Sequence, residues 1–187
     1  SDAGSVYLLD QTKEDHDPHL IFKVAQNDSL PNLSFQEFTL PLNPKSLAGY
    51  VALTGESLSI EDAYDLPEDV PYHFDRDFDL KVAYRTCSVL VLPMQDQKGE
   101  IIGVLQLINR KLEPDTRVTA ENALEVTQPY SPWEETILRS LASQAAISIE
   151  RSILQESIET LFEGFVKASV KAIESRDPTT SGHSERV

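Results

Sequence analysis

Two nearly continuous apolar runs constrain the fold of this chain more than any other feature. Residues 87–94 and 101–108 flank the turn sequence Asp96-Gln97-Lys98-Gly99. Apolar runs joined by so short a polar turn predict an antiparallel β-hairpin. Neither run alternates strictly between apolar and polar residues, which indicates strands buried on both faces. The sequence therefore predicts a sheet with helices over both of its faces.

The residues before this hairpin predict more strands and one short helix. Residues 5–10 and 20–25 are rich in β-branched and aromatic side chains, with polar residues between them, so they predict a strand pair. Residues 37–42 are a third short candidate. Residues 44–46 open a helix that ends at Gly55.

Two stretches predict loops. Residues 61–79 are acidic and aromatic and are interrupted by Pro67 and Pro71, which predicts a long loop with at most one helical turn. Loops of this length in compact domains are usually binding loops or lids. Residues 112–128 are polar and predict a surface loop.

The segment 131–174 predicts one long helix. Ser131 can cap the first free amides, Pro132 suits the first helical position, and Glu134 completes a capping box. A helix over this segment would be roughly 65 Å long. Its bend is expected at Gly164, which weakens a helix by roughly 1 kcal/mol relative to alanine.

The second half of this helix carries apolar residues at four-three spacing. The two columns are Ile147, Leu154, Leu161 and Ala168, and Arg151, Ile158, Phe165 and Ala172. This spacing is typical of a coiled-coil seam, so we expect a homodimer through the C-terminal helix. The alternative is one amphipathic helix that packs on its own core.

Composition excludes several classes of partner. The formal charge of −15 would repel phosphate backbones and anionic membranes, so we expect neither nucleic acid nor membrane contact. The one cysteine, Cys87, cannot form an internal disulfide or a thiolate metal site, which favours a reducing cytoplasm. No apolar run approaches the roughly 20 residues that span a bilayer.

Most of residues 1–149 resembles a GAF domain, in particular the type found beside cyclic-nucleotide phosphodiesterases. The resemblance rests on the order and spacing of the segments 48–51, 54–56, 60–64, 84–86, 91–93 and 102–109. The phosphodiesterase signature of Asn, Lys, Phe, Asp and Glu corresponds to Asn109, Lys111, Tyr130, Glu134 and Glu135. The resemblance implies an α+β fold, a GAF-like antiparallel sheet flanked by helices, with a long C-terminal signalling helix.

The resemblance also implies a ligand pocket between the sheet, the short helix and the acidic loop. Its lining would be Leu47, Ala48, Tyr64, Phe74, Asp79, Val82 and Thr86. Val82-Ala83 replaces a Thr-Gly pair frequent in cyclic-GMP binders and so removes a donor. A cyclic nucleotide, another small metabolite and an empty structural pocket all remain open. We further expect an ion pair between Lys111 and Glu134 that ties the last helix to the sheet.

The last residues resemble the opening of an HD-GYP domain, a metal-dependent hydrolase of cyclic di-GMP. The resemblance rests on Arg176-Asp177-Pro178 and on residues 181–187, in which His183 matches the first metal ligand of that family. One imidazole makes no metal site, so divalent metal ions are expected only in a complete hydrolase domain. We find no catalytic cluster and no cofactor site in this chain, and expect it not to be an enzyme itself.

The expected organisation is a GAF sensory domain over 1–149, a coiled-coil-like output helix over 150–174, and the truncated start of an HD-GYP domain over 175–187. The expected function is regulatory sensing of a small molecule in a bacterial signalling protein that controls a downstream cyclic di-GMP phosphodiesterase. The alternative is a ligand-free module for dimerisation and signal transmission.

Overall fold

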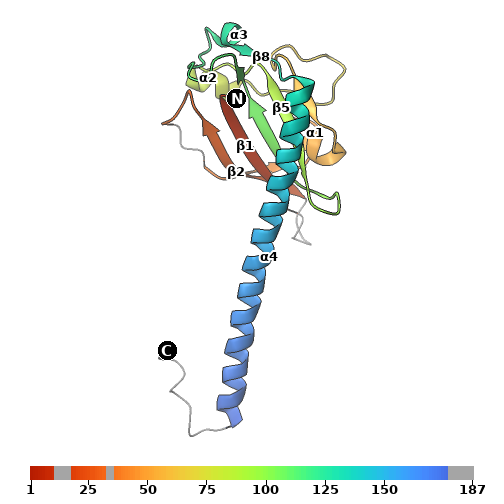
Figure 1. Ribbon diagram of the computed structural model, residues 1–187, viewed down its shortest axis with the longest axis vertical. Coiled ribbons are helices and arrows are strands. Elements are labelled where there is room, and N and C mark those ends of the chain that lie inside the picture. Colours follow the sequence, from red (N-terminus) through yellow and green to blue (C-terminus); the bar gives the residue numbers. More distant parts are fainter. Residues whose placement is uncertain (11–17, 33–35, 177–187) are drawn as a thin grey trace. The chain divides into compact units, whose positions relative to one another are not determined.

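The computed structural model describes residues 1–10, 18–32 and 36–176, and the chain divides into two compact units, Ser1–Ile147 and Ser148–Val187. Within the first unit, six antiparallel strands form one sheet in the order β3-β2-β1-β6-β5-β4 (Figure 1). The strands are β1 (Ala3–Asp10), β2 (His19–Asn27), β3 (Phe38–Pro41), β4 (Leu58–Ile60), β5 (Val89–Gln95) and β6 (Ile101–Ile108). The predicted antiparallel sheet is thus confirmed.

The central hairpin forms as its sequence predicts. Strands β5 and β6 pair in antiparallel register, with Val91 opposite Gln106. In the turn, Asp96 Oδ1 accepts hydrogen bonds from the amides of Lys98 and Glu100, each at 2.8 Å. Gly99 has φ +83°, in the region that glycine adopts at little cost. The turn residues therefore fix the register of the central hairpin.

Helix α1 (Leu47–Thr54) covers one face of the sheet, where it contacts β5 and β6. Ser46 Oγ accepts the amide of Gly49 at 3.0 Å and so caps the helix, and Gly55 ends it at φ +73°. Val51 of this helix packs with Val89 and Val104 in the main core, and all three are fully buried.

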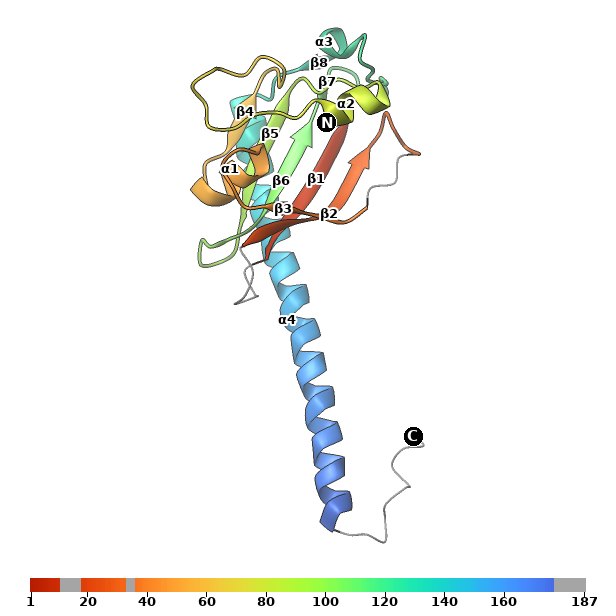
Figure 2. The same ribbon diagram turned by 180° about the vertical axis from the view of Figure 1, so that it is seen from behind.

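Helix α4 (Pro132–Arg176) begins on the other face, so that α1 and the first turns of α4 lie on opposite sides of the sheet (Figures 1 and 2). Ala142 and Ala146 on α4, and Leu90 and Leu92 on β5, are fully buried. The small alanines let the helix approach the sheet closely. The expectation of helices on both faces is confirmed.

Other parts of the chain differ from the sequence-based expectations. The three-residue β4 pairs with β5, and α2 (Asp77–Val82) begins near the end of the predicted acidic loop. Residues 112–128 are not only a surface loop, since they contain α3 (Ala123–Val126) and β8 (Thr127–Gln128), which pairs with β7 (Arg110–Lys111). Val118 and Ala123 of this segment are buried with Tyr84 and Cys87 in a second core cluster.

Candidate functional site

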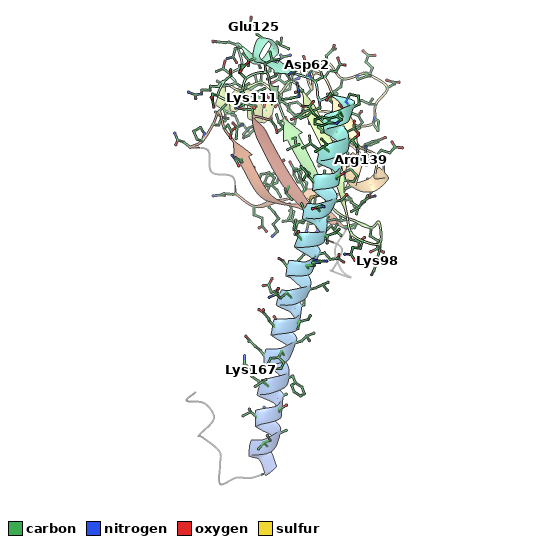
Figure 3. The ribbon with its side chains drawn as sticks, viewed as in Figure 1. Asp62, Lys98, Lys111, Glu125, Arg139 and Lys167 are labelled. Carbon is green, nitrogen blue, oxygen red and sulfur yellow. The ribbon has the colours of Figure 1, made fainter. Side chains whose placement is uncertain are left out.

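The functional loops meet at the end of the sheet where β5 begins and β6 ends. Figure 3 shows Asp62 and Lys111 at this end and Lys98, in the β5–β6 turn, at the other. Asp62 Oδ1 accepts the amide of Tyr64 at 3.0 Å and so fixes the start of the acidic loop. Its other oxygen accepts a hydrogen bond from Arg85 at 2.7 Å. Asp62 thus holds a loop and an arginine in place together.

The Tyr64 ring has two guanidinium groups over it. Arg76 Cζ lies 4.3 Å and Arg85 Cζ 4.4 Å from the ring centroid. Arg76 also donates to the Tyr64 carbonyl oxygen at 2.7 Å. Both cation–π distances are within the range at which the ring quadrupole attracts a cation. Arg85 is also ion-paired with Asp62 at 2.7 Å, so of the two cations Arg76 has the less neutralised charge.

Asp79 lies behind Tyr64 and is 1% exposed. Its carboxylate accepts hydrogen bonds from the Tyr64 hydroxyl at 3.1 Å, the Thr86 amide at 2.7 Å and the Thr86 hydroxyl at 3.2 Å. Burial raises the pKa of Asp79, and these hydrogen bonds only partly oppose the effect. Three of the predicted pocket residues, Tyr64, Asp79 and Thr86, are therefore joined in one hydrogen-bonded group.

A cavity of about 390 Å³ lies beside this group, and the acidic loop itself forms it. Among its lining residues are Tyr64, Tyr72, His73, Phe74 and Arg76. The Tyr64 and Phe74 ring centroids are 6.0 Å apart. This volume lies near the lower end of the range of small-ligand pockets.

The remaining predicted lining residues lie elsewhere. Leu47 and Ala48 are 5% and 3% exposed and belong to the main core. Val82 packs against the second core cluster. Of the seven predicted residues, only Tyr64 and Phe74 line the cavity. Sequence reasoning did not assign Arg76 and Arg85 to the site. The signal that could have identified them is one arginine within, and one shortly after, an aromatic-rich acidic loop.

Asn109 joins the site to the end of β6. It is fully buried and has φ +53°, in the left-handed region that asparagine tolerates. Its Oδ1 accepts the Cys87 amide at 2.7 Å, and its Nδ2 donates to the Arg85 carbonyl at 2.8 Å and to the Tyr84 hydroxyl at 3.0 Å. One amide side chain therefore fixes the segment that carries both Arg85 and Thr86.

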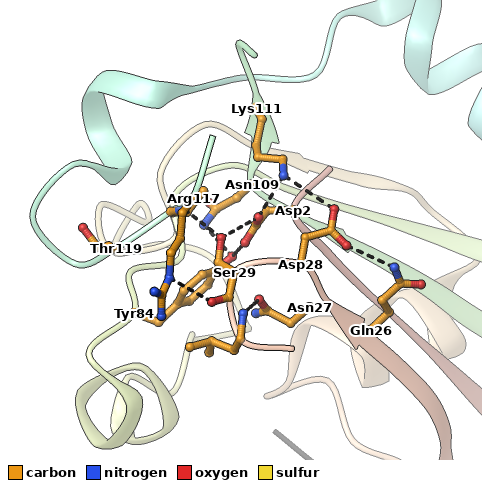
Figure 4. Close-up of polar contacts among 12 residues, drawn as sticks. Asp2, Gln26, Asn27, Asp28, Ser29, Tyr84, Asn109, Lys111, Arg117 and Thr119 are labelled. Atoms are coloured by element: carbon orange, nitrogen blue, oxygen red, sulfur yellow. Dashed lines mark hydrogen bonds and ion pairs between the residues drawn. The ribbon is translucent and has the colours of Figure 1, made fainter. Parts of the chain in front are cut away.

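Lys111 belongs to a buried polar cluster around Asp2, which is 1% exposed (Figure 4). Lys111 Nζ lies 3.2 Å from Asp2 Oδ1 and 3.5 Å from Asp28 Oδ2. Asp2 also accepts hydrogen bonds from the hydroxyls of Ser29 and Tyr84, each at 2.7 Å. The carboxylate of Asp2 is thus paired and fully hydrogen-bonded, which its burial requires.

The expected ion pair between Lys111 and Glu134 is wrong, because the basic partner of Glu134 is a different residue. Glu134 pairs with Arg110, the residue before Lys111. The predicted capping box does form, because Glu134 Oε2 accepts the Ser131 amide at 2.9 Å and Ser131 Oγ accepts the Glu134 amide at 3.3 Å. Burial raises the pKa of Glu134, but the hydrogen bonds from Ser131 and Arg110 outweigh it and lower the pKa to about 2.

The other two signature residues also lie at the start of α4. Tyr130 is 8% exposed, and Glu135 pairs with Arg139 one turn along the helix at 2.6 Å. The pair of Arg110 and Glu134 ties the first turn of α4 to the strand that follows Asn109.

The sequence matches the GAF domain family over residues 1–149. The chain belongs to this family. It is 32% identical over 177 residues to a cGMP-specific 3',5'-cyclic phosphodiesterase of Drosophila pseudoobscura pseudoobscura, in an alignment that covers 83% of this chain and 15% of that protein. This GAF domain is therefore a regulatory sensing domain related to those of cyclic-nucleotide phosphodiesterases, and it spans a small part of its relative.

Solved structures share the fold. The GAF domain of a phosphoenolpyruvate-protein phosphotransferase from Coxiella burnetii superposes with a TM-score of 0.57 at 18% identity, covering 84% of this chain and 76% of that one. A GAF domain/HD domain protein from Geobacter sulfurreducens superposes with a TM-score of 0.52 at 19% identity, covering 82% of this chain and 83% of that one. These likenesses show the GAF fold.

Two expectations concern the rest of the chain. His183, the expected first metal ligand of an HD-GYP domain, lies outside the described residues. Across residues 1–10, 18–32 and 36–176, none of the helices combines the length and apolar character needed to cross a bilayer.

Proposed function

We propose that this GAF domain senses a small aromatic anion, such as a cyclic nucleotide, in the loop cavity beside Tyr64. The carrying observation is the pair of guanidinium groups over the Tyr64 ring, one of which, Arg76, lines the cavity. A purine ring can stack on Tyr64 or Phe74, and a phosphate monoanion can pair with Arg76. The relationship to a cGMP-specific phosphodiesterase supports this ligand class.

The occupied site would act on α4 through a short series of contacts. Arg85, which lies over Tyr64, accepts a hydrogen bond from Asn109 at its carbonyl oxygen. Arg110, the residue after Asn109, pairs with Glu134 in the first turn of α4. A ligand that draws Arg76 or Arg85 away from Tyr64 would change these contacts. The size of the change is limited by how much more tightly the ligand binds the changed arrangement than the original one. Helix α4 would then pass the change to a dimer partner and onward.

The proposed output is a metal-dependent cyclic di-GMP phosphodiesterase of the HD-GYP type in a bacterial cytoplasm. Support comes from the resemblance of residues 176–187 to the opening of such a domain, with His183 as one ligand of its divalent metals. In this proposal residues 1–149 sense, residues 150–174 transmit within a homodimer, and catalysis belongs to the downstream domain.

A thermal-shift titration tests the ligand. The chain is titrated with cyclic GMP, cyclic AMP, cyclic di-GMP and guanosine, and a saturable rise is expected with a cyclic mononucleotide but not with guanosine, which lacks the phosphate. Saturation at about 100 times the dissociation constant stabilises by about 2.7 kcal/mol. Arg76→Ala should reduce the shift, whereas the control Lys81→Ala, an exposed lysine away from the cavity, should retain it.

The second candidate is a ligand-free dimerisation and transmission module. It is favoured by the burial of Leu47 and Ala48 in the main core, against which Tyr64 and Phe74 also pack. On this alternative none of the nucleotides shifts the melting temperature of the parent chain, of Arg76→Ala or of Lys81→Ala.

A further inference from the structure

Arg76 lies in a strongly acidic loop but is held by a neutral residue. Residues 61–79 contain eight acidic side chains and this one arginine. Within the described ranges 1–10, 18–32 and 36–176, Arg76 forms no ion pair with a carboxylate. Its guanidinium instead donates to the Tyr64 carbonyl oxygen at 2.7 Å and lies 4.3 Å from the centroid of the Tyr64 ring. Both contacts come from Tyr64.

These contacts preserve the positive charge of Arg76. A guanidinium paired with a carboxylate has little net charge left for another anion, and Arg85, paired with Asp62 at 2.7 Å, is in that state. A ring face and a carbonyl oxygen attract a guanidinium without neutralising it. Arg76 also lines the loop cavity. A ligand in the cavity can therefore reach a cation whose charge is not yet compensated.

Tyr64 is itself fixed independently of Arg76. Its amide donates to Asp62 at 3.0 Å, and its hydroxyl donates to Asp79 at 3.1 Å. Arg85 Cζ lies 4.4 Å from the ring centroid on its own account. Arg76, by contrast, is exposed, so burial does not restrict where its guanidinium can go. The fixed tyrosine is therefore what restricts the position of the arginine.

The held guanidinium keeps donors for an anion. Arginine carries five N–H groups, and the bond to the Tyr64 carbonyl oxygen uses one of them. A guanidinium stacked on a ring contacts it with its face and leaves its edges, which carry the donors, available. A phosphate accepts two parallel hydrogen bonds from such an edge. Arg76 can thus meet a phosphate from its position over Tyr64.

We propose that Tyr64 is a positioning residue, which holds Arg76 unneutralised and ready for the anionic group of the ligand. The inference rests on the proposed function and deepens it, because it assigns Tyr64 a role other than stacking on the ligand. A flexible side chain loses conformational freedom when it binds, and holding it in place beforehand removes part of that cost. Without the tyrosine ring, the guanidinium is free to pair with the carboxylates of its own loop.

Inorganic phosphate is the first probe, because it has no ring that could stack on Tyr64. Phenylglyoxal modifies arginine side chains, and peptide mapping by mass spectrometry follows Arg76, with the exposed Arg139 on α4 as an internal reference. We expect phosphate to protect Arg76 in a saturable way. The half-protecting concentration should rise about two- to tenfold in Tyr64→Leu, the factor that corresponds to fixing one flexible side chain.

Tyr64→Phe is the matched control. It keeps the ring and the backbone carbonyl group, and it loses the hydroxyl bond to Asp79 just as Tyr64→Leu does. Any effect of that lost bond is therefore shared by the two variants, and phosphate should protect Arg76 in Tyr64→Phe as in the parent chain. Equal protection in Tyr64→Phe and Tyr64→Leu, or no protection in the parent chain, would overturn the inference.

A double-mutant cycle separates positioning from stacking. Cyclic GMP is titrated into Tyr64→Phe and Tyr64→Leu, each with Arg76 intact and each combined with Arg76→Ala, and circular dichroism confirms that every variant folds. A positioning role predicts that leucine weakens binding about two- to tenfold only where Arg76 is present. The same loss in both backgrounds would show that Tyr64 stacks on the purine instead, and would contradict the inference.

The outcomes also distinguish this inference from the proposed function. Phosphate protection that depends on the Tyr64 ring, without a thermal shift by any cyclic nucleotide, supports the positioning of Arg76 and contradicts the proposed ligand class. A cyclic-nucleotide shift that is equal in Tyr64→Phe and Tyr64→Leu supports the ligand class and contradicts the positioning role.

Discussion

At the scale of single residues, Asn109 connects several separate segments of this domain. It makes three side-chain hydrogen bonds from a fully buried position, and its left-handed backbone turns the chain from β6 into β7. Each bond fixes a different group: the Cys87 amide, the Arg85 carbonyl and the Tyr84 hydroxyl. Removing the side chain leaves buried polar groups without partners, which is more costly than losing the bonds themselves.

We expect Asn109→Ala to destabilise the domain by about 3 kcal/mol, since it orphans buried polar groups and puts alanine in the left-handed region. Asn109→Gly loses the same bonds but adopts φ +53° freely, so it should be more stable than Asn109→Ala by about 1 kcal/mol. Urea unfolding measures both. Equal stabilities of the two variants would show that the backbone conformation is not costly there.

Glu134 should make stability depend on pH. Its pKa falls from an ordinary 4.5 to about 2 in the folded chain. A carboxyl group with a lowered folded pKa contributes stability that is fully present above its unfolded pKa and is lost as the pH falls through the folded pKa. Glu134→Gln should therefore melt below the parent chain at pH 7, and the two should converge as the pH falls from 4.5 to 2. A melting-temperature difference that persists unchanged at pH 2 would contradict this account.

At the scale of elements, sequence patterns within a few residues predicted the local structure correctly. Contacts between residues far apart in the chain were not predicted. The β5–β6 hairpin, the helix start at residues 44–46, the Ser131 cap and the Gly55 helix end all follow from residues within a few positions of one another. The three-residue β4 carries too short a pattern to distinguish a strand from a loop. Neither guanidinium over Tyr64 was predicted, because Arg85 reaches it from 21 positions along the chain by way of the folded sheet.

A simple geometric cause explains why Glu134 pairs with Arg110 and not with Lys111. Successive side chains of a strand point to opposite faces, so a shift of one residue changes the partner completely. In β7, Arg110 faces Glu134 on α4 and Lys111 faces Asp2 at the start of β1. The sequence predicted a cation paired with Glu134, but which of two adjacent cations pairs with the helix requires the structure.

The two adjacent cations should therefore have separable effects. Arg110→Ala removes the pair with Glu134, so amide hydrogen exchange should rise in the first turns of α4. Lys111→Ala leaves Asp2 buried without its cation, so exchange should rise in β1 and β2 while the first turns of α4 stay protected. The reverse pattern, with α4 loosened only by Lys111→Ala, would restore the pairing expected from sequence.

Two glycines should respond to alanine with opposite signs. A Cβ at Gly103 in β6 would lie 2.4 Å from the Tyr7 carbonyl oxygen, so β1 and β6 would have to separate. A Cβ at Gly164 in α4 meets nothing within 4 Å, and alanine there gains about 1 kcal/mol of helix propensity. Thermal melts should show Gly103→Ala destabilised and Gly164→Ala stabilised. A neutral Gly103→Ala would mean that the two strands can part at no cost.

At the scale of the whole molecule, net charge would act against the homodimer proposed through α4. Each copy carries a formal charge of −15, so a dimer brings together −30 in total. The predicted seam is almost uncharged, and its attraction would be the burial of exposed apolar side chains such as Leu154 and Leu161. Association is then limited by long-range repulsion and not by the interface itself.

Salt should consequently strengthen the dimer. The screening length falls from about 30 Å at 0.01 M to about 8 Å at 0.15 M ionic strength, so repulsion between domains is largely removed while apolar burial is unaffected. Sedimentation equilibrium should show a dissociation constant that decreases over this range. An interface held mainly by ion pairs would respond in the opposite direction, because salt also screens attraction between exposed charges. Arg151→Leu separates the two effects, because it replaces the one charged residue of the predicted seam with an apolar side chain: the variant should dimerise more tightly and still show a dissociation constant that decreases with salt.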